Sequence, residues 1–311
     1  MQLQLAQLNV ATLRRPMDHA DTADFAHGLV PVNTAAEASP GFVWRLQTAD
    51  GDATSISAFP NPLTIVNLTV WESVAALRDF VYRGTHRDFF RRRVEWFEAG
   101  SQAVMWWVIA GSTPTVEQAK ARLDFIDRFG PSPFAFEMGR QFQQLVVVRR
   151  DLDHPDLAPM LDRLDDELVA NTPEGGSNFL HIAAEHVADG SGAFYVAYVD
   201  GAPSACGAYR RIDGVDDAAE VKRMWVDPVQ RGNRLGAAVL STIETAVAAE
   251  GLRELRLETG EHLTAAVGLY RRCGFAACEP WGEYIDVPHS YTMSKQIGDS
   301  DSSRARQSPS S

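Results

Sequence analysis

The chain of 311 residues contains few cysteines, only Cys206, Cys273 and Cys278. None of them belongs to a CxxC pair, and no cluster of histidines accompanies them. This pattern argues against a disulfide framework and against a zinc site, and it favours a reducing, cytoplasmic location. We therefore expect no metal ligand set in this protein.

Long apolar runs and basic patches are also missing. No stretch of about 18 uncharged apolar residues occurs, which predicts that the chain does not span a membrane. The first residues, MQLQLAQLNVATLRR, show neither the basic start nor the cleavage site of a secretory signal. The formal net charge is −12, and residues 144–311 carry 16 basic against 26 acidic side chains. This balance argues against nucleic-acid and membrane partners and tolerates a cationic substrate.

What is present is the composition of a soluble globular chain, with 45% hydrophobic and 23% charged residues. The length suits two domains. Breaks in composition predict a first domain at 1–143 and a second at 144–297. Residues 298–311 (GDSDSSRARQSPSS) hold a single alanine as their apolar residue. Because such a segment buries too little surface to offset its ordering entropy, we predict a disordered tail.

Residue patterns in the first half predict an α+β domain. Alternating apolar residues indicate strands, and Ser73 and Thr115 are expected N-caps of helices. The expected strands are 3–10, 42–46, 63–71, 102–109 and 134–138. The expected helices are 22–39, 74–85, 87–97 and 116–129.

The second half alternates strands and helices more regularly. The Asp200–Gly201 turn between two apolar runs predicts a β-hairpin. The expected strands are 145–149, 194–199, 205–211, 219–226, 255–258 and 291–294. The expected helices are 157–170, 178–187, 235–250 and 265–273.

The most informative segment is the loop 227–234, between a strand that ends at Val226 and a helix that starts near Leu235. Glycine in such a loop lets backbone N–H groups approach a ligand, and the helix N-terminus adds unpaired donors and a positive dipole end. These features together predict a pyrophosphate site. Arg231 and Arg234 add charge that can pair with phosphate oxygens. Neither a Walker A loop nor a GxGxxG fingerprint is present.

Two motifs carry a family resemblance over residues 144–297. The run Arg231-Gly232-Asn233-Arg234-Leu235-Gly236-Ala237 resembles motif A of the GNAT superfamily of N-acetyltransferases, Gln/Arg-x-x-Gly-x-Gly/Ala, with Arg234 in place of the middle glycine. The run 266–275 (AVGLYRRCGF) resembles the family's A-x-x-LY-x-x-x-GF signature. Leu263 stands where many members have a cofactor-binding asparagine, so that contact is not expected here.

The resemblance implies a GNAT mixed-sheet fold and transfer of an acetyl group from acetyl-CoA to an amine of a small molecule or protein, by direct attack in a ternary complex. Tyr270 matches the position of the general acid, and Glu220 matches that of a general base; an ordered water is the alternative base. Glu283 and Tyr284 are expected at the acceptor site, or on a plain surface loop. The implied acetyl-CoA contacts are the backbone of Met224, Trp225 and Val226, and the pyrophosphate loop Arg231, Gly232, Asn233, Arg234, Leu235, Gly236 and Ala237.

Residues 3–140 resemble a second, uncharacterised family of dimeric α/β-barrel domains with ferredoxin-like topology, related to antibiotic-biosynthesis monooxygenases. The segments 5–9, 70–73 and 86–87 carry this resemblance. It implies a homodimer through this domain and leaves open an oxygenase-type activity. His86, which has no second ligand, is interpreted as a helix-surface or interface residue rather than a haem ligand. A further alternative is that the second domain binds acyl-CoA as a sensor or scaffold without turnover.

Overall fold

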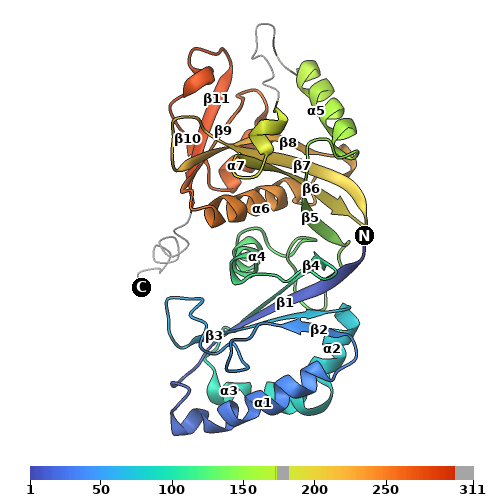
Figure 1. The fold of residues 1–311 in the computed structure, drawn as a ribbon, viewed down its shortest axis with the longest axis vertical. Helices are drawn as coiled ribbons and strands as arrows, with labels where there is room; N and C mark the ends of the chain where they lie inside the picture. Colours follow the sequence, from blue (N-terminus) through green and yellow to red (C-terminus); the bar gives the residue numbers. More distant parts are fainter. Residues whose placement is uncertain (172, 174–181, 298–311) are drawn as a thin grey trace. The chain divides into compact units, whose positions relative to one another are not determined.

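The computed structural model describes residues 1–171, 173 and 182–297 (Figure 1). The predicted disordered tail, 298–311, and the start of the predicted helix 178–187 lie outside these residues. The chain divides into two compact units, Met1–Gln144 and Leu145–Ser311. Within the described ranges, no helix is both long and apolar enough to cross a membrane.

The N-terminal unit contains a four-stranded antiparallel sheet in the order β2-β3-β1-β4. The strands are β1 (Leu3–Thr12), β2 (Phe42–Arg45), β3 (Thr64–Trp71) and β4 (Gln102–Ile109). The helices are η1 (Ala20–Thr22), α1 (Ala23–Glu37), α2 (Val74–Tyr82), α3 (Gly84–Trp96) and α4 (Val116–Phe129).

Local signals in this half predicted most elements correctly. The hydroxyl of Ser73 accepts a hydrogen bond from the Ala76 N–H at the start of α2, and Thr115 forms a capping box with Gln118 at the start of α4. The predicted strand at 134–138 was wrong. Phe136 makes only an isolated bridge to Met105, because the segment before it forms a turn in which the Ser132 N–H donates to the Ala135 carbonyl and the Phe134 N–H donates to the Ser132 hydroxyl.

Helices cover both faces of this sheet (Figure 1). On one face Trp71 stacks on Phe80 of α2, and α1 and α3 lie over the rest of the same face. On the opposite face Arg122 of α4 lies over the ring of Trp106. Side chains alternate along each strand, so Gln7 and Asn9 of β1 point to the α1–α3 face.

The C-terminal unit contains a seven-stranded sheet in the order β10-β11-β9-β8-β7-β6-β5. Its strands are β5 (Leu145–Arg150), β6 (Gly192–Val199), β7 (Ala202–Arg211), β8 (Ala218–Val226), β9 (Glu254–Gly260), β10 (Ala276–Ala277) and β11 (Ser290–Gln296). Its helices are α5 (Leu157–Asn171), η2 (Ala184–Val187), η3 (Pro228–Gln230), α6 (Leu235–Ala249), α7 (Thr264–Arg272) and η4 (Gly282–Tyr284). β8 and β9 run parallel, and the other neighbours are antiparallel.

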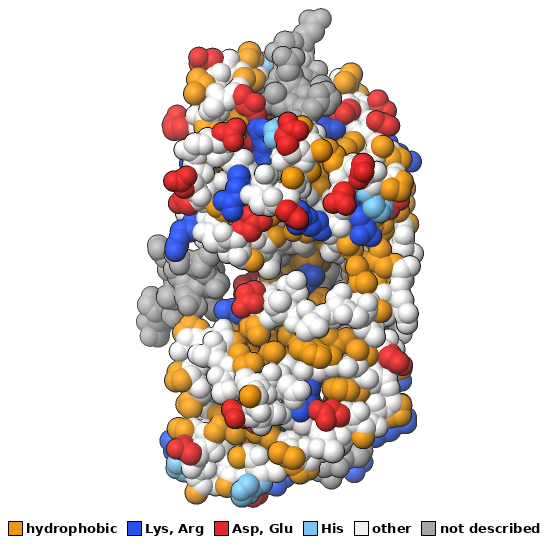
Figure 2. Space-filling view, viewed as in Figure 1, with side chains coloured by type: hydrophobic (Ala, Val, Ile, Leu, Met, Phe, Trp, Pro, Cys, Tyr) orange, Lys and Arg blue, Asp and Glu red, His pale blue; other side chains and the backbone are white. Residues whose placement is uncertain are grey.

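The predicted strands and the helices α5, α6 and α7 of this half are confirmed within one to three residues. The exception is the predicted helix 178–187, whose described part is only the short 3-10 helix η2. On the face of this unit that the space-filling view shows, acidic and basic side chains are interspersed without a large patch of one sign (Figure 2).

The helix α6 packs closely on β7 and β8 because of one glycine. A Cβ atom at Gly207 would lie 2.3 Å from Met224 Sδ and 2.9 Å from Val239 Cγ1. The absence of a side chain therefore fixes the distance between α6 and the sheet. Trp225 points to the opposite face, where its indole contacts α5. The sheet is thus enclosed between α5 and α6, as Figure 1 shows.

Candidate active site

The strands β8 and β9 separate part-way along their length. Their parallel pairing runs from Ala218–Glu254 to Val221–Leu257 and ends there, although β8 continues to Val226. Arg223 has a φ of +56°, and the β7–β8 register shifts at this point. The bulge redirects β8. The edge of β8 at 224–226 is therefore not occupied by β9.

The loop after β8 holds the predicted pyrophosphate residues. Gly232 and Arg234 both have positive φ values, +88° and +64°. Arg234 thus adopts the left-handed conformation that the family pattern assigns to glycine, and it forms the N-cap of α6. The Ala238 N–H donates to the Arg234 carbonyl at 3.0 Å. The N–H groups of residues 235–237, at the start of α6, have no intrahelical acceptor. Together with the positive end of the helix dipole they favour the binding of an anion.

Gly236 serves helix packing as well as this loop. A Cβ atom here would lie 2.8 Å from Leu269 Cδ2 and 3.5 Å from Val226 Cγ2. The glycine therefore lets the first turn of α6 approach both α7 and the end of β8. Leu235 and Ala237, which flank it, are also buried.

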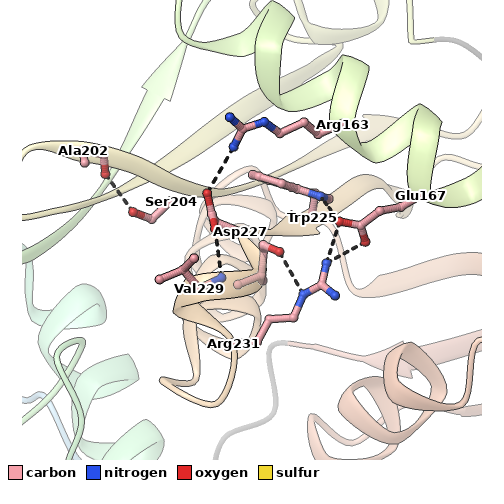
Figure 3. A network of polar contacts seen from close by, with 9 residues as sticks. Arg163, Glu167, Ala202, Ser204, Trp225, Asp227, Val229 and Arg231 are labelled. Carbon is pink, nitrogen blue, oxygen red and sulfur yellow. Dashed lines mark hydrogen bonds and ion pairs between the residues drawn. The ribbon is translucent and has the colours of Figure 1, made fainter.

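The side chain of Arg231 already has partners in this structure (Figure 3). Its Nε donates to the Val226 carbonyl at 3.1 Å, and its Nη2 lies 2.8 and 2.6 Å from the two carboxylate oxygens of Glu167. Glu167 also accepts from the Trp225 indole at 3.1 Å. The predicted phosphate-binding arginine is thus held against α5, and its charge is paired.

Two more residues of α5 hold the same region. Asp165 pairs with Arg223 at 2.7 Å. Arg163 pairs with Asp227 at 3.3 Å, as Figure 3 shows. Asp227 in turn accepts from the Val229 N–H, which caps η3. Sequence reasoning missed this function of α5. The charged residues at i and i+4 of a predicted helix, positions 163 and 167, were the available signal.

The predicted base contacts one of the predicted acceptor residues directly. Glu220 is only 1% exposed, and it accepts hydrogen bonds from Arg210 Nε at 2.7 Å and from the Tyr284 hydroxyl. Lys222 Nζ lies 3.5 Å from Glu220 and donates to the Tyr284 oxygen at 2.7 Å. Arg210 also donates to Glu283 at 2.6 Å. These five contacts join β7, β8 and η4 in one cluster.

Burial sets the protonation of this cluster. It lowers the pKa of Lys222, an effect that nearby Glu220 opposes. Burial also raises the pKa of the Tyr284 phenol, and the Glu220 charge adds to that shift. Tyr284 therefore stays protonated and continues to donate to Glu220.

Glu258 is a second carboxylate that sequence reasoning missed. It lies on β9 beyond the last residue that pairs with β8, and it is half-buried. Burial raises the pKa of its carboxyl group, while Ser290 and Lys222 lower it. The parallel pairing of Glu220 with Arg256 puts Glu258 two positions further along the same face. The signal in the sequence was an acidic residue that alternates with buried Leu255 and Leu257.

Tyr270, the predicted acid, is 7% exposed on α7, and its ring packs against Phe275. Among the described residues, its hydroxyl has no hydrogen-bond partner. Burial raises its pKa, and the charges of Cys273 and Glu258 contribute in the same direction. The phenol is therefore held in its protonated form, the form that can donate a proton.

Comparison with known proteins shows the families to which the chain belongs. Residues 157–275 match the acetyltransferase (GNAT) family, and residues 4–165 match a domain of unknown function, DUF3291. An "IAA acetyltransferase" from Azospirillum brasilense is 41% identical over 104 residues, which are 33% of this chain and 67% of that protein. The chain belongs to the DUF3291 family and, through its C-terminal half, to the GNAT acetyltransferases. The GNAT domain is thus an acyltransferase, and the predicted resemblance to that family is confirmed.

Solved structures of GNAT proteins resemble this domain at low identity. A putative acyl-CoA N-acyltransferase from Klebsiella pneumoniae is 22% identical, with 50% of this chain and 98% of that chain covered and a TM-score of 0.43. A GNAT acetyltransferase from Elizabethkingia anophelis, solved with acetyl-CoA bound, is 14% identical, with 49% and 98% covered and a TM-score of 0.35. In the described part of this chain, no group of three or more metal-ligating side chains is placed to hold a metal ion.

Proposed function

We propose that the GNAT domain transfers an acetyl group from acetyl-CoA to an amine of a small molecule or a protein, by direct attack in a ternary complex. The observation that carries this proposal is the separation of β8 from β9, together with the buried Tyr270 of α7, whose hydroxyl has no hydrogen-bond partner among the described residues. An unoccupied strand edge can accept an extended arm by backbone pairing. A protonated phenol near that edge can serve a leaving thiolate.

The donor would bind along the β8 edge and the following loop. Met224, Trp225 and Val226 would pair with the pantetheine arm through their backbone groups. The pyrophosphate would accept hydrogen bonds from the N–H groups of loop residues 231–237. In this proposal Arg231 must share its guanidinium between Glu167 and a phosphate, whereas Arg234 contributes mainly through its backbone conformation.

The reaction needs two proton transfers, one to the leaving thiolate and one from the attacking amine. The amine nitrogen attacks the carbonyl carbon, and the developing oxyanion is held by a backbone N–H where the strands separate. The carbon–sulfur bond then breaks, and the thiolate takes a proton from Tyr270. The proton of the new ammonium group passes to a base.

Two carboxylates are candidates for that base. Glu220, the predicted base, is buried, and both of its oxygens accept hydrogen bonds. Glu258 is more accessible, and its raised pKa suits proton acceptance closer to neutral pH. We therefore propose Glu258 as the proton acceptor in direct contact with the amine, and Glu220 as the group that orients Tyr284. Glu283 and Tyr284 would line the acceptor side.

For the DUF3291 domain, we propose the ferredoxin-like arrangement within residues 1–143. The strand order β2-β3-β1-β4, with helices after β1, β3 and β4, supports it. The predicted homodimer would have to form around α4, because this helix occupies the sheet face opposite α1 and α3.

The test measures the release of CoA thiol by the full chain with acetyl-CoA and a panel of amines. IAA, which appears in the name of the Azospirillum relative, is included as a further candidate acceptor. A productive acceptor should give saturable release. Tyr270→Phe should lower kcat by about 10²- to 10⁴-fold because the acid is lost, yet leave acetyl-CoA affinity in calorimetry nearly unchanged. Tyr195→Phe is the matched control; it removes another partly buried phenol of the same domain and should leave kcat unchanged.

The outcomes separate the alternatives. Binding of acetyl-CoA without thiol release for any acceptor would favour the sensor or scaffold. Absence of binding by the folded protein would overturn the proposal. For the base, Glu258→Gln should remove the acidic limb of the pH profile of kcat/KM. If Glu220→Gln removes this limb instead, the original assignment of Glu220 is correct.

A further inference from the structure

The N-terminal unit contains a cavity of about 660 Å³, which is not part of the proposed acetyl-transfer site. It lies between the sheet and the helices α1 and α3. One wall is the sheet face that carries Gln7, Asn9 and Asn67, and the other consists of helix side chains such as Phe25 and Phe89. This volume is typical of a site for a drug-sized ligand.

The helical wall is mostly apolar and is fixed by close packing. Aromatic side chains dominate it, and Phe25 and Phe89 both pack against the ring of Trp96. The helices α1 and α3 meet at Gly28, where a Cβ atom would lie 2.0 Å from Phe89 Cζ. The aromatic surface is thus in place without a ligand, and it suits a flat, aromatic molecule.

The sheet wall carries polar side chains among its apolar ones, where a helix-covered face is ordinarily apolar. Asn9 and Asn67 stand directly opposite each other in the β1–β3 register. Asn33 of α1 adds a third asparagine to the lining. Among the described residues, none of these three side chains has a hydrogen-bond partner. Each carboxamide offers both donors and an acceptor, so the cavity presents unused hydrogen-bonding capacity beside an aromatic wall.

The charges along the lining balance one another. Arg45 is paired with Glu37 at 2.7 Å. The remaining cations of the lining, Arg14 and Arg93, are matched in number by the anions Asp52 and Glu98. A binding site for a charged molecule would carry an excess of one sign, whereas the three cations of this lining are balanced by its two anions and by Glu37, the partner of Arg45 outside it.

From these three observations we propose that the DUF3291 domain binds an uncharged aromatic small molecule in this cavity. The rings of the molecule lie against Phe25, Phe89 and Trp96, and a hydrogen-bonding group meets the Asn9–Asn67 pair. The site is independent of acetyl-CoA, since every lining residue belongs to the N-terminal unit.

The test uses two fluorescent probes with the same ring skeleton. N-phenyl-1-naphthylamine is uncharged and carries one N–H donor, whereas 1-anilinonaphthalene-8-sulfonate adds a negative charge. We expect the full chain to bind the neutral probe saturably at one site and at least tenfold more tightly than the sulfonate. Equal or tighter binding of the sulfonate would overturn the uncharged assignment, and absence of saturable binding of the neutral probe would overturn the site.

Variants locate the binding. Ala103→Trp fills the cavity from an exposed position on β4 opposite Asn9, and it should weaken the neutral probe at least tenfold. Asn9→Leu with Asn67→Leu should weaken it roughly three- to tenfold through lost hydrogen bonds. Ala277→Trp adds the same bulk on exposed β10 of the other unit and should change nothing, as should Tyr270→Phe. If Ala103→Trp and the Asn double variant leave affinity unchanged while thermal unfolding shows folded protein, the probe binds elsewhere and the proposal is wrong.

Discussion

The two units satisfy their polar side chains in opposite ways. In the GNAT domain, Glu220 is almost completely buried, and Arg210, Lys222 and Tyr284 all contact it. In the DUF3291 domain, Asn9 and Asn67 line an open volume, and their side chains contact no partner among the described residues. In the GNAT domain these polar groups bind one another, whereas in the DUF3291 domain they are available to bind a ligand.

The difference follows from the cost of burying charge. An ion removed from water must be paired and hydrogen-bonded or it destabilises the fold by several kcal/mol. A carboxamide that faces an open cavity keeps its hydration and costs little. Charged chemistry therefore requires a connected cluster, such as the one around Glu220. Recognition of a neutral molecule needs only a few uncommitted amides.

The largest stability effect should come from breaking the buried cluster. Glu220→Gln removes the charge that compensates Arg210 and Lys222, so we expect a loss of about 3–5 kcal/mol in the free energy of unfolding. Glu283→Gln is the matched control, because Glu283 pairs with the same Arg210 but is 41% exposed at its side chain. Its cost should stay below about 1 kcal/mol. Urea unfolding at neutral pH measures both.

The same measurement on Asn9→Leu sharpens the contrast. An amide without protein partners can be replaced at little cost, so the change should stay within about 0.5 kcal/mol. A loss for Asn9→Leu as large as that for Glu220→Gln would show that the cavity amides are structural, and the comparison between the two units would fail.

A smaller effect is expected at the close approach of α6 and α7. Gly236→Ala places a methyl group 2.8 Å from Leu269 Cδ2. Such overpacking should cost about 1–3 kcal/mol, and it should weaken acetyl-CoA binding because the loop moves with α6. Gly268→Ala makes the same change on α7, where the new methyl group would meet the flexible end of Arg272 at 3.4 Å. That variant should be stabilised by about 0.5–1 kcal/mol, since alanine favours the helix. Equal losses in both variants would point to helix distortion rather than contact with Leu269.

Much of the fold could be predicted from local pattern. The caps at Ser73 and Thr115, the β8–loop–α6 segment and the signature around Tyr270 all depend on residues close in sequence. The false strand at 134–138 shows the limit of this approach, because apolar residues alone do not reveal whether a ladder partner is available. Phe136 forms only an isolated bridge with Met105.

The rest depends on contacts between distant residues. Glu167 meets Arg231 across 64 positions, and Tyr284 meets Glu220 across the same separation. The motif identifies Arg231 as cationic but not as already paired. The cavity depends on the spacing of α1 and α3 above the sheet, which no single segment encodes. Pairing and empty space are properties of the assembled fold, and so they were not visible in the sequence.

The smallest predicted effect concerns the Arg231–Glu167 pair. Both side chains are substantially exposed, 50% and 37%, so a double-mutant cycle with Arg231→Ala and Glu167→Ala should give a coupling of only about 0.2–1 kcal/mol in unfolding.

The effect of the two variants on acetyl-CoA affinity is the more informative result. If Arg231 contacts the pyrophosphate, Arg231→Ala should weaken binding roughly three- to tenfold. Glu167→Ala should leave binding unchanged or tighten it, because the guanidinium is released from its competing carboxylate. If both variants weaken binding equally, Arg231 acts by holding the loop against α5, and the phosphate is bound by backbone N–H groups alone. Calorimetry of the two single variants and the double variant therefore shows whether the Arg231 charge binds the ligand or, like the Glu220 charge, only stabilises the fold.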